Sequence, residues 1–389
     1  MPVKWILVLL MSAPFFVNCN ASSDQGSLRL GAEKVEVWLP ILEGKRVGLL
    51  VNHTSMVNEV HLLDTMLALG IDVQRIFVPE HGFRGTGDAG ELIKDGVDVR
   101  SGLPIISLYG ASKKPDQRQL DGLDVVVFDI QDVGVRFYTY ISSMHLMMEA
   151  CAESGLPLVV FDRPNPNGDY VDGPVLKEGF TSFVGMHPIP VVHGLTVGEL
   201  AMMINGEGWL KNAVTCDLTL VSMDHYRHDM VYSLPIQPSP NLPNYLSIRL
   251  YPSLCFFEGT EVSVGRGTDF PFQVAGYPDS AFGEFTFTPE SRPGASDPPQ
   301  KGKLCYGLDL RYKEAAEHRF TLHYLIDFYE RSGRSSDFIS RRRFFNLLAG
   351  SDRLATQIEA GWTEDAIRDD WQVDLDNYRP MRERYLLYP

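Results

Sequence analysis

Short, nearly continuous apolar segments alternate with helical patterns along the first half of the chain, and this alternation restricts the fold more than any other feature. Segments rich in valine, leucine and isoleucine are typical of strands that are buried on both faces of a parallel sheet. The helical patterns at residues 57–69 and 137–152 would cover these faces. The sequence therefore predicts an α/β fold with a Rossmann-like, doubly wound, mostly parallel sheet. The expected strands are residues 46–51, 75–78, 103–108, 124–130, 156–161 and 189–192.

The second half of the chain has a less regular pattern. A helix is expected over residues 195–209, with Thr196 as its N-cap and Glu199 at the spacing of a capping box. The Pro-rich stretch 235–243 predicts a domain connection or an active-site loop. Further elements are a strand at 284–288 and helices at 320–332, 341–348 and 352–360. The predicted organisation is a leader and linker over residues 1–27, a Rossmann-like catalytic domain over 28–234, and a smaller C-terminal α+β domain over 235–389 that completes the cleft.

The N-terminus is predicted to be separate from the fold. Lys4 precedes apolar runs at residues 5–11 and 13–17, which is the pattern of a secretory signal. The runs are too short for a comfortable membrane span. They end near Cys19, which predicts either a lipidated lipoprotein or a cleaved signal with an incidental cysteine. We therefore expect an exported protein of a bacterium, either periplasmic or anchored to the membrane through Cys19.

Charge and motif content exclude several classes of function. A net charge of −15 argues against a nucleic-acid partner, because such binding relies on basic side chains that neutralise phosphates. No G-x-G-x-x-G follows the first strand and no P-loop is present, which disfavours an NAD-linked oxidoreductase. Four widely spaced cysteines beyond the leader, without a C-x-x-C pair, argue against a zinc site, while disulfides stay open for an exported protein. The sequence thus predicts no cofactor.

Every predicted strand is followed by polar or titratable residues. Parallel topology would gather these residues along one edge of the sheet, where ligands bind in open α/β folds. A purely structural sheet needs only turn residues there, so a functional cleft is favoured. Glu80 is the best catalytic candidate, because a carboxylate at such a strand end would be partly desolvated and suited to general acid work. The strand-end residues are Asn52, His53, Glu80, His81, Tyr109, Asp129, Gln131, Asp132, Asp162, Arg163, Asn165 and His193.

Two further segments carry candidate binding residues. Arg136 and Tyr138 follow the fourth strand, where the arginine would hold an anion near a helix N-terminus and the tyrosine would stack on a sugar. Helix packing is an equally good interpretation of the tyrosine. A Gly-rich segment brings Glu258 and Arg266 toward the cleft, unless they form only a surface ion pair in a turn. Substrate contact and a structural role both stay open for His53, His81 and His193.

Three classes of function fit such a cleft. The first is a hydrolase with Glu80 as its acid. The second is a non-catalytic protein that binds sugar or peptidoglycan without hydrolysing it. The third is a metal-dependent hydrolase, because the cleft would supply histidines and carboxylates, but no H-E-x-x-H or other close ligand spacing is present and no metal is predicted.

Five motifs together resemble one bacterial family. They are VGLLVNHTS, PEHGFRG, VVVFDIQDVGVRFYTYI, LVVFDRPNPNG and FEGTEVSVGRGTDFPF, and they span nearly all of the chain after the leader. The family was long grouped as a domain of unknown function, DUF1343, and is now identified as the NamZ-type exo-β-N-acetylmuramidases, a group of glycoside hydrolases. The resemblance implies release of N-acetylmuramic acid from the non-reducing ends of peptidoglycan fragments during cell-wall turnover. It also implies a pocket between a Rossmann-like domain and a second domain.

The resemblance assigns catalytic roles to matching positions. Glu80 in PEHGFRG is implied as the catalytic carboxylate, with His81 beside it. Asp129 and Glu258 are both candidates for the second catalytic group. A third route is attack by the acetamido group of the substrate, with Asp129 orienting it.

The predicted binding residues follow from the same motifs and from the strand ends. Arg136 or Arg163 would pair with the lactyl carboxylate, the group that distinguishes muramic acid from glucosamine. The expected partners are muropeptides and muramic-acid disaccharides. The predicted substrate-binding residues are Asn52, His53, Gln131, Arg136, Tyr138, Arg163, Asn165, His193, Glu258 and Arg266.

Overall fold

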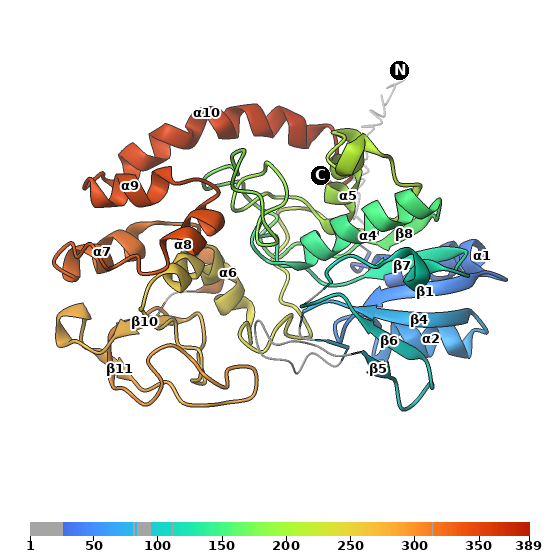
Figure 1. The fold of residues 1–389 in the computed structure, drawn as a ribbon, viewed down its shortest axis with the longest axis horizontal. Helices are drawn as coiled ribbons and strands as arrows, with labels where there is room; N and C mark the ends of the chain where they lie inside the picture. The colour runs from blue at the N-terminus through green and yellow to red at the C-terminus, as the bar shows by residue number, and fades with distance from the viewer. Residues whose placement is uncertain (1–25, 81, 84–94, 111, 313) are drawn as a thin grey trace, which may run out of the picture.

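The computed structural model describes residues 26–80, 82–83, 95–110, 112–312 and 314–389 of the chain. The predicted leader with Cys19 lies outside the described residues, as does His81, so both remain predictions. Figure 1 shows two parts, with the main sheet on the right and the later helices on the left. No helix within the described ranges is long and apolar enough to cross a membrane.

The first part is built on a seven-stranded sheet. Its strands are β1 (Arg46–Val51), β4 (Asp72–Val78), β5 (Gly96–Val97), β6 (Pro104–Ser107), β7 (Val125–Asp129), β8 (Leu158–Phe161) and β9 (Leu218–Val221). Their order in the sheet is β5-β6-β4-β1-β7-β8-β9, and all neighbours are parallel except β5 and β6. Numbered along the chain, the six parallel strands run 3-2-1-4-5-6, which is the strand order of a Rossmann fold. The predicted fold class is confirmed.

Helices cover both faces of this sheet. They are α1 (Val35–Leu42), α2 (Leu62–Ala68), α3 (Gln117–Leu120), α4 (Tyr140–Ser154) and α5 (Val197–Gly206). Successive strand residues point to opposite faces and enter two separate cores. Leu50 and Phe128 share one core with α4 and α5, whereas Leu49 and Val127 share the other with α1 and α2. This alternation explains why the strands are apolar throughout.

The predicted sixth strand at residues 189–192 is wrong. This segment stays outside the sheet, where Val192 makes isolated bridges with Val135 and Asp172. Pro190 lies inside the segment and has no N–H group to donate to a regular strand ladder. The short strand β9 takes the sixth parallel position instead, beside β8.

Two of the predicted helices in this part have different outcomes. The helix predicted at 195–209 is α5, and its capping box is present, because Thr196 and Glu199 each accept a hydrogen bond from the backbone N–H of the other. The helix predicted at 57–69 begins only with α2. A hairpin of β2 (Met56–Val57) and β3 (Val60–His61) precedes it, turned by Asn58 at a φ of 52°.

The second part contains a small antiparallel sheet with helices packed beside it. Its strands are β10 (Val274–Tyr277), β11 (Phe285–Phe287) and β12 (Cys305–Asp309), in the order β10-β12-β11. Its helices are α6 (Tyr245–Leu254), α7 (His323–Arg331), α8 (Arg342–Ala349) and α9 (Arg353–Glu359). The predicted α+β character is confirmed, with the expected strand and three helices close to their predicted positions. The division expected at residues 234 and 235 stays a prediction.

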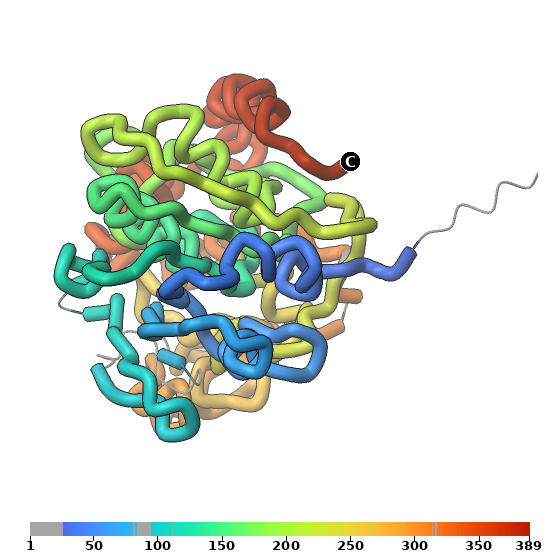
Figure 2. The backbone as a smooth tube through the Cα atoms, turned by 90° about the vertical axis from the view of Figure 1, so that its right-hand side faces the viewer, coloured from blue at the N-terminus to red at the C-terminus, as the bar shows by residue number. Residues whose placement is uncertain are grey.

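A long helix that the sequence analysis missed joins the two parts. α10 (Glu364–Glu383) runs from α9 across to the region of α5 (Figure 1). The Tyr378 hydroxyl donates to the carbonyl of His193 at 2.7 Å, and Arg382 donates to the carbonyl of Gly194. Beyond the helix, the Tyr388 hydroxyl donates to Asp162 at 2.7 Å, so the end of the chain returns to the first part (Figure 2).

Candidate active site

A cavity of about 1050 Å³ lies between the two parts of the molecule. The first part contributes residues that follow its parallel strands and that open α4, while the second part contributes α6, the 3₁₀ helix η3 (Cys255–Gly259) and residues 294–299. Three residues of the Pro-rich stretch, Ser239, Asn241 and Leu242, also line it. Of the predicted site residues, those in the lining are Glu80, Tyr138, Glu258 and Arg266.

Glu80 follows β4 at the carboxyl edge of the sheet and is half-buried in the cavity wall. The Thr139 hydroxyl donates a hydrogen bond of 2.8 Å to its Oε2. The Tyr109 phenol is also hydrogen-bonded to Glu80, and burial together with the carboxylate charge raises the pKa of this phenol. Tyr109 therefore stays protonated and donates. Two neutral hydroxyl groups thus fix the carboxylate in the wall.

An aromatic patch lies beside Glu80. Tyr138 and Tyr140 are nearly fully buried, their ring centroids are 4.8 Å apart, and both hydroxyls donate to the carbonyl of Pro238, at 2.9 and 3.0 Å. Tyr251 packs edge-on against Tyr138 at 5.9 Å. All three tyrosines line the cavity, which gives it a surface suited to the apolar face of a sugar ring.

The wall from the second part carries an ion pair. Arg266 donates from Nε at 2.9 Å and from Nη2 at 2.5 Å to Oε1 of Glu258. Burial opposes the charge of Arg266, but the Glu258 carboxylate outweighs it and raises the pKa of the guanidinium. The arginine also lies 5.0 Å from the ring centroid of Phe272. The predicted ion pair exists, and it faces the cavity.

Asp129 and Arg163 form a second, fully buried ion pair at the ends of β7 and β8. Nε and Nη2 of Arg163 donate to the two oxygens of Asp129, at 2.5 and 2.8 Å, and Nη2 also donates to the carbonyl of Met56 at 3.0 Å. The exposed fraction is 4% for the Arg163 side chain and 0% for the Asp129 side chain. Neither residue lines the cavity, so the structure does not place the predicted catalytic Asp129 or the predicted anion-binding Arg163 there.

The other predicted residues of this edge also bond to the protein itself. Oδ1 of Asn52 accepts from the N–H and the hydroxyl of Thr54, at 2.9 and 2.6 Å. Gln131 donates to the carbonyls of Asp132 and Pro164, and Nε2 of His53 lies 2.8 Å from a backbone carbonyl. Gln131 and Arg163 line a separate hollow of about 350 Å³.

Arg136, Asn165 and His193 lie in the interior rather than at the cavity. Arg136 donates to the carbonyls of Pro174, Ile189 and Leu348, at 2.6 to 2.8 Å, so it ties α8 to the first part instead of binding a ligand anion. Burial lowers its pKa to about 9. Asn165 donates to the carbonyl of Leu195, and His193 accepts from the N–H of the same residue. Burial lowers the pKa of His193 to about 3.

Sequence reasoning missed several residues of the cavity and its surroundings. Tyr109 was named only as a strand end, and Thr139 and Lys113 were not considered, although all three line the cavity. Burial is the main cause that raises the pKa of Tyr138 and of Tyr140, and the charge of Asp132, which is itself buried, adds to it. In the sequence, the one signal for these missed residues was that they are polar positions in the loops that follow strands.

Asp132 is an unusual carboxyl group. Its Oδ2 accepts a 2.7 Å hydrogen bond from the N–H of Gly134, while Oδ1 has no partner in the described part of the chain. Gly134 has a φ of 76°, and a β-carbon there would collide with Asn165, so only glycine fits this turn. Burial raises the pKa of Asp132 to about 7.

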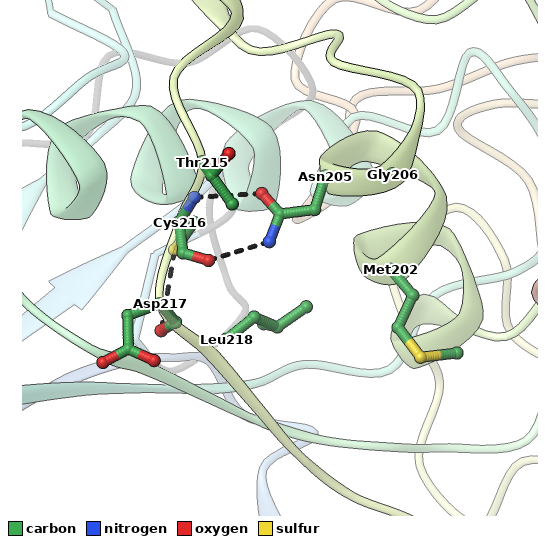
Figure 3. Close-up of a pocket in the computed structure, with 7 residues that line it drawn as sticks. All are labelled: Met202, Asn205, Gly206, Thr215, Cys216, Asp217 and Leu218. Carbon is green, nitrogen blue, oxygen red and sulfur yellow. Dashed lines mark hydrogen bonds between the residues drawn. The ribbon is translucent and has the colours of Figure 1, made fainter.

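A further hollow of about 670 Å³ lies at the opposite edge of the sheet, between the end of α5 and the start of β9 (Figure 3). Asn205 bonds there to both the N–H and the carbonyl of Cys216, at 3.0 and 2.8 Å. This amino edge is not where parallel α/β sheets bind ligands. The cavity between the two parts is therefore the candidate active site.

The cysteines and histidines give no second candidate. Cys151, Cys216, Cys255 and Cys305 are buried free thiols in the structure. Within the described ranges, no group of three or more histidine, cysteine, aspartate or glutamate side chains is arranged to hold a metal ion.

Comparison with known proteins gives a consistent match over most of the chain. Residues 47–246 match the family described as exo-beta-N-acetylmuramidase NamZ, N-terminal, and residues 249–388 match its C-terminal counterpart. The chain is 37% identical over 373 residues to the peptidoglycan beta-N-acetylmuramidase NamZ of Bacillus subtilis, covering 89% of this chain and 88% of that protein. Crystal structures of two DUF1343 family proteins from Bacteroides fragilis are also similar, with TM-scores of 0.87 and 0.81 and identities of 46% and 30%. Each match covers 93% of this chain and 99% of the other.

Proposed function

Because the chain belongs to the exo-β-N-acetylmuramidase NamZ family, we propose that it releases N-acetylmuramic acid from the non-reducing ends of peptidoglycan fragments. It is a glycosidase, and a role in cell-wall turnover is consistent with this activity. One observation carries the proposal. Glu80 is held by two hydroxyl groups in the wall of a large cavity, at the edge of the sheet where Rossmann-like folds bind ligands.

Glu80 is the proposed general acid. Hydrolysis of a glycosidic bond passes through an oxocarbenium-like state and needs a proton on the leaving oxygen. Thr139 and Tyr109 would hold the carboxyl group in position while the proton moves from it to that oxygen. The aromatic patch around Tyr138 would support the sugar ring whose bond is cleaved.

Glu258 is the proposed second carboxylate. Asp129 has both oxygens engaged by Arg163 and does not line the cavity, so it is left out of the proposed catalytic pair. Glu258 lines the cavity from the other side, and its Oε1 is held by Arg266. Glu258 would have one of three roles in the reaction. It would stabilise the positive charge that develops on the sugar, activate the attacking water, or form a covalent intermediate with the sugar. Measuring which anomer of N-acetylmuramic acid is released first distinguishes retention from inversion.

Incubation with a disaccharide of N-acetylmuramic acid β-linked to N-acetylglucosamine tests the proposal. We expect mass analysis to show the two free sugars as products. Glu80→Gln should lower the rate roughly 10²–10⁴-fold, the usual contribution of a general acid. The exposed Glu43, at the end of α1, provides the matched control Glu43→Gln, which should leave the rate unchanged.

Two results would contradict the proposal. If the intact disaccharide binds but is not cleaved, the chain is a sugar-binding protein. If Glu80→Gln retains full turnover, Glu80 is not the acid and the reaction must be assigned to other groups.

We also propose that the protein is exported to the periplasm or anchored to a bacterial membrane. The proposal rests on the sequence of residues 1–20, where a basic start and apolar runs precede Cys19. Fractionation of cells that express the full chain tests it. Recovery of the unprocessed chain in the cytoplasm would contradict export.

A further inference from the structure

Within the described ranges, three cationic side chains line the cavity, and they differ in their partners. Arg266 is paired with the Glu258 carboxylate, and Arg341 donates to the carbonyl of Thr260 at 2.5 Å. Lys113 has no carboxylate within ion-pair distance among the residues that the structure describes. Of the cavity cations that the structure describes, Lys113 is therefore the one whose side chain has neither an ion pair nor a hydrogen bond.

An aromatic pair holds Lys113 at the cavity wall. Its ammonium nitrogen lies 4.4 Å from the ring centroid of Phe183 and 5.9 Å from that of Tyr109, and these rings are 6.1 Å apart. Such cation–π contacts orient an ammonium group without neutralising it. The next residue, Lys114, points instead to Glu149 and Glu153, at 3.0 and 2.8 Å. Two adjacent lysines thus have different uses, one in structural ion pairs and one at the cavity.

Lys113 is linked to the proposed acid through a single residue. The Tyr109 ring contacts the Lys113 ammonium, and the Tyr109 hydroxyl is hydrogen-bonded to Glu80. A sugar whose glycosidic oxygen reaches Glu80 would therefore place its nearby substituents close to Lys113. Muramic acid differs from glucosamine by a lactyl ether on the ring, and this ether ends in a carboxylate.

We propose that Lys113 binds the lactyl carboxylate of the N-acetylmuramic acid residue and thereby selects it over N-acetylglucosamine. The inference rests on the proposed function, because the carboxylate belongs to the substrate proposed above. Lys113 thus takes the role that the sequence analysis predicted for Arg136 or Arg163. The guanidinium groups of these two arginines are buried and bonded to the protein itself.

The test compares two chromogenic substrates. One is the 4-nitrophenyl β-glycoside of N-acetylmuramic acid, and the other is the same glycoside with the lactyl carboxylate converted to a primary amide. We expect Lys113→Met to lower kcat/KM for the acid roughly 10- to 100-fold, the usual range for a hydrogen bond to a charged group. The variant should cleave the amide as fast as the wild type does, and Lys113→Arg should recover most of the activity toward the acid.

Lys303 offers a control for the loss of one positive charge. It is exposed in the second part and lies outside the cavity lining, and its ammonium group donates to Gln300 at 3.2 Å. Lys303→Met should leave the ratio of acid to amide cleavage at the wild-type value. Thermal melting of each variant checks that it is folded, and Lys113→Gln is measured in case Lys113→Met does not fold.

The outcomes separate the two proposals. If the wild type cleaves the acid but folded Lys113 variants keep the same acid-to-amide ratio, the role of Lys113 is overturned while the glycosidase proposal stands. If the wild type cleaves neither substrate nor the disaccharide, the proposed function fails and the role of Lys113 fails with it.

Discussion

The carboxyl edge of the sheet and the cavity wall beside it are both rich in polar side chains, but they use these side chains in opposite ways. At the ends of β7 and β8, Asp129 and Arg163 neutralise each other in a buried pair. In the cavity wall, Glu80 is held by the neutral hydroxyls of Thr139 and Tyr109, and its carboxylate faces open space. An arginine neutralises a carboxylate with an opposite charge, whereas a hydroxyl donates a hydrogen bond to it without cancelling its charge.

This difference separates a framework from a reactive surface. The strand-end framework lets the sheet end in charged groups without exposing them to substrate. Among the described residues, the cavity wall presents the Glu80 carboxylate and the Lys113 ammonium group to a ligand. Substitutions in the two regions should therefore have separable effects, on stability in the framework and on catalysis in the wall.

The largest effect on stability is expected for Arg163→Met. Removing the arginine leaves the Asp129 carboxylate buried without its partner, which typically lowers the free energy of unfolding by about 3–5 kcal/mol. Urea unfolding followed by circular dichroism measures this change. Arg46→Met is the matched control, because Arg46 makes a similar two-armed pair with Asp124 at the amino edge of the same sheet, but with exposed fractions of 50% and 39%.

Water already solvates the Arg46 pair, so its loss should change stability much less. Equal losses in the two variants would contradict the comparison. So would an Arg163→Met protein that keeps its stability but loses activity, because Arg163 would then belong to the site.

The sheet was largely predictable because its strands are apolar on both faces, as with β1 and β7. β9 escaped detection because it is an edge strand whose residues are mostly half-buried, which weakens the apolar signal. α10 was also missed, although its buried residues Ile367, Trp371 and Leu375 recur every four positions. That stripe was sufficient to find a helix, but not to show that the helix would bridge the two parts.

The site was predictable only in part. Glu80 was found because parallel topology places strand ends together, and this needs no knowledge of side-chain contacts. Whether a polar strand end becomes framework or reactive surface depends on its partner in space. Arg163 follows Asp129 by 34 positions and Thr139 follows Glu80 by 59, so neither pairing has a local signal in the sequence.

A smaller effect, dependent on pH, is expected for Asp132→Asn. The pKa of Asp132 is about 7 in the folded chain and near 3.8 in the unfolded chain, so the folded state holds a proton that the unfolded state has lost. Stability of the wild type should therefore fall as pH rises from about 4 to about 7, by up to about 4 kcal/mol, and level off above that. The asparagine variant lacks this slope.

Urea unfolding of both proteins at several pH values measures this difference. The stability of Asp132→Asn relative to the wild type should increase through the same pH interval. Parallel pH profiles would contradict this prediction. They would show that Asp132 is already ionised in the folded chain.

The smallest effect is expected for Tyr109→Phe, which removes one hydroxyl from the cavity wall and keeps the ring that contacts Phe183 and Lys113. Losing one neutral hydrogen bond to Glu80 should lower kcat roughly 10-fold, with KM and the melting temperature nearly unchanged, because the bond positions the acid and does not bind substrate. Tyr170→Phe is the control, since the buried Tyr170 hydroxyl has no hydrogen-bond partner in the described residues and lies outside the cavity lining. A Tyr109→Phe protein that loses stability at unchanged kcat would place Tyr109 in the framework. The hydrogen bond between Tyr109 and Glu80 would then stabilise the fold and would not position the acid for catalysis.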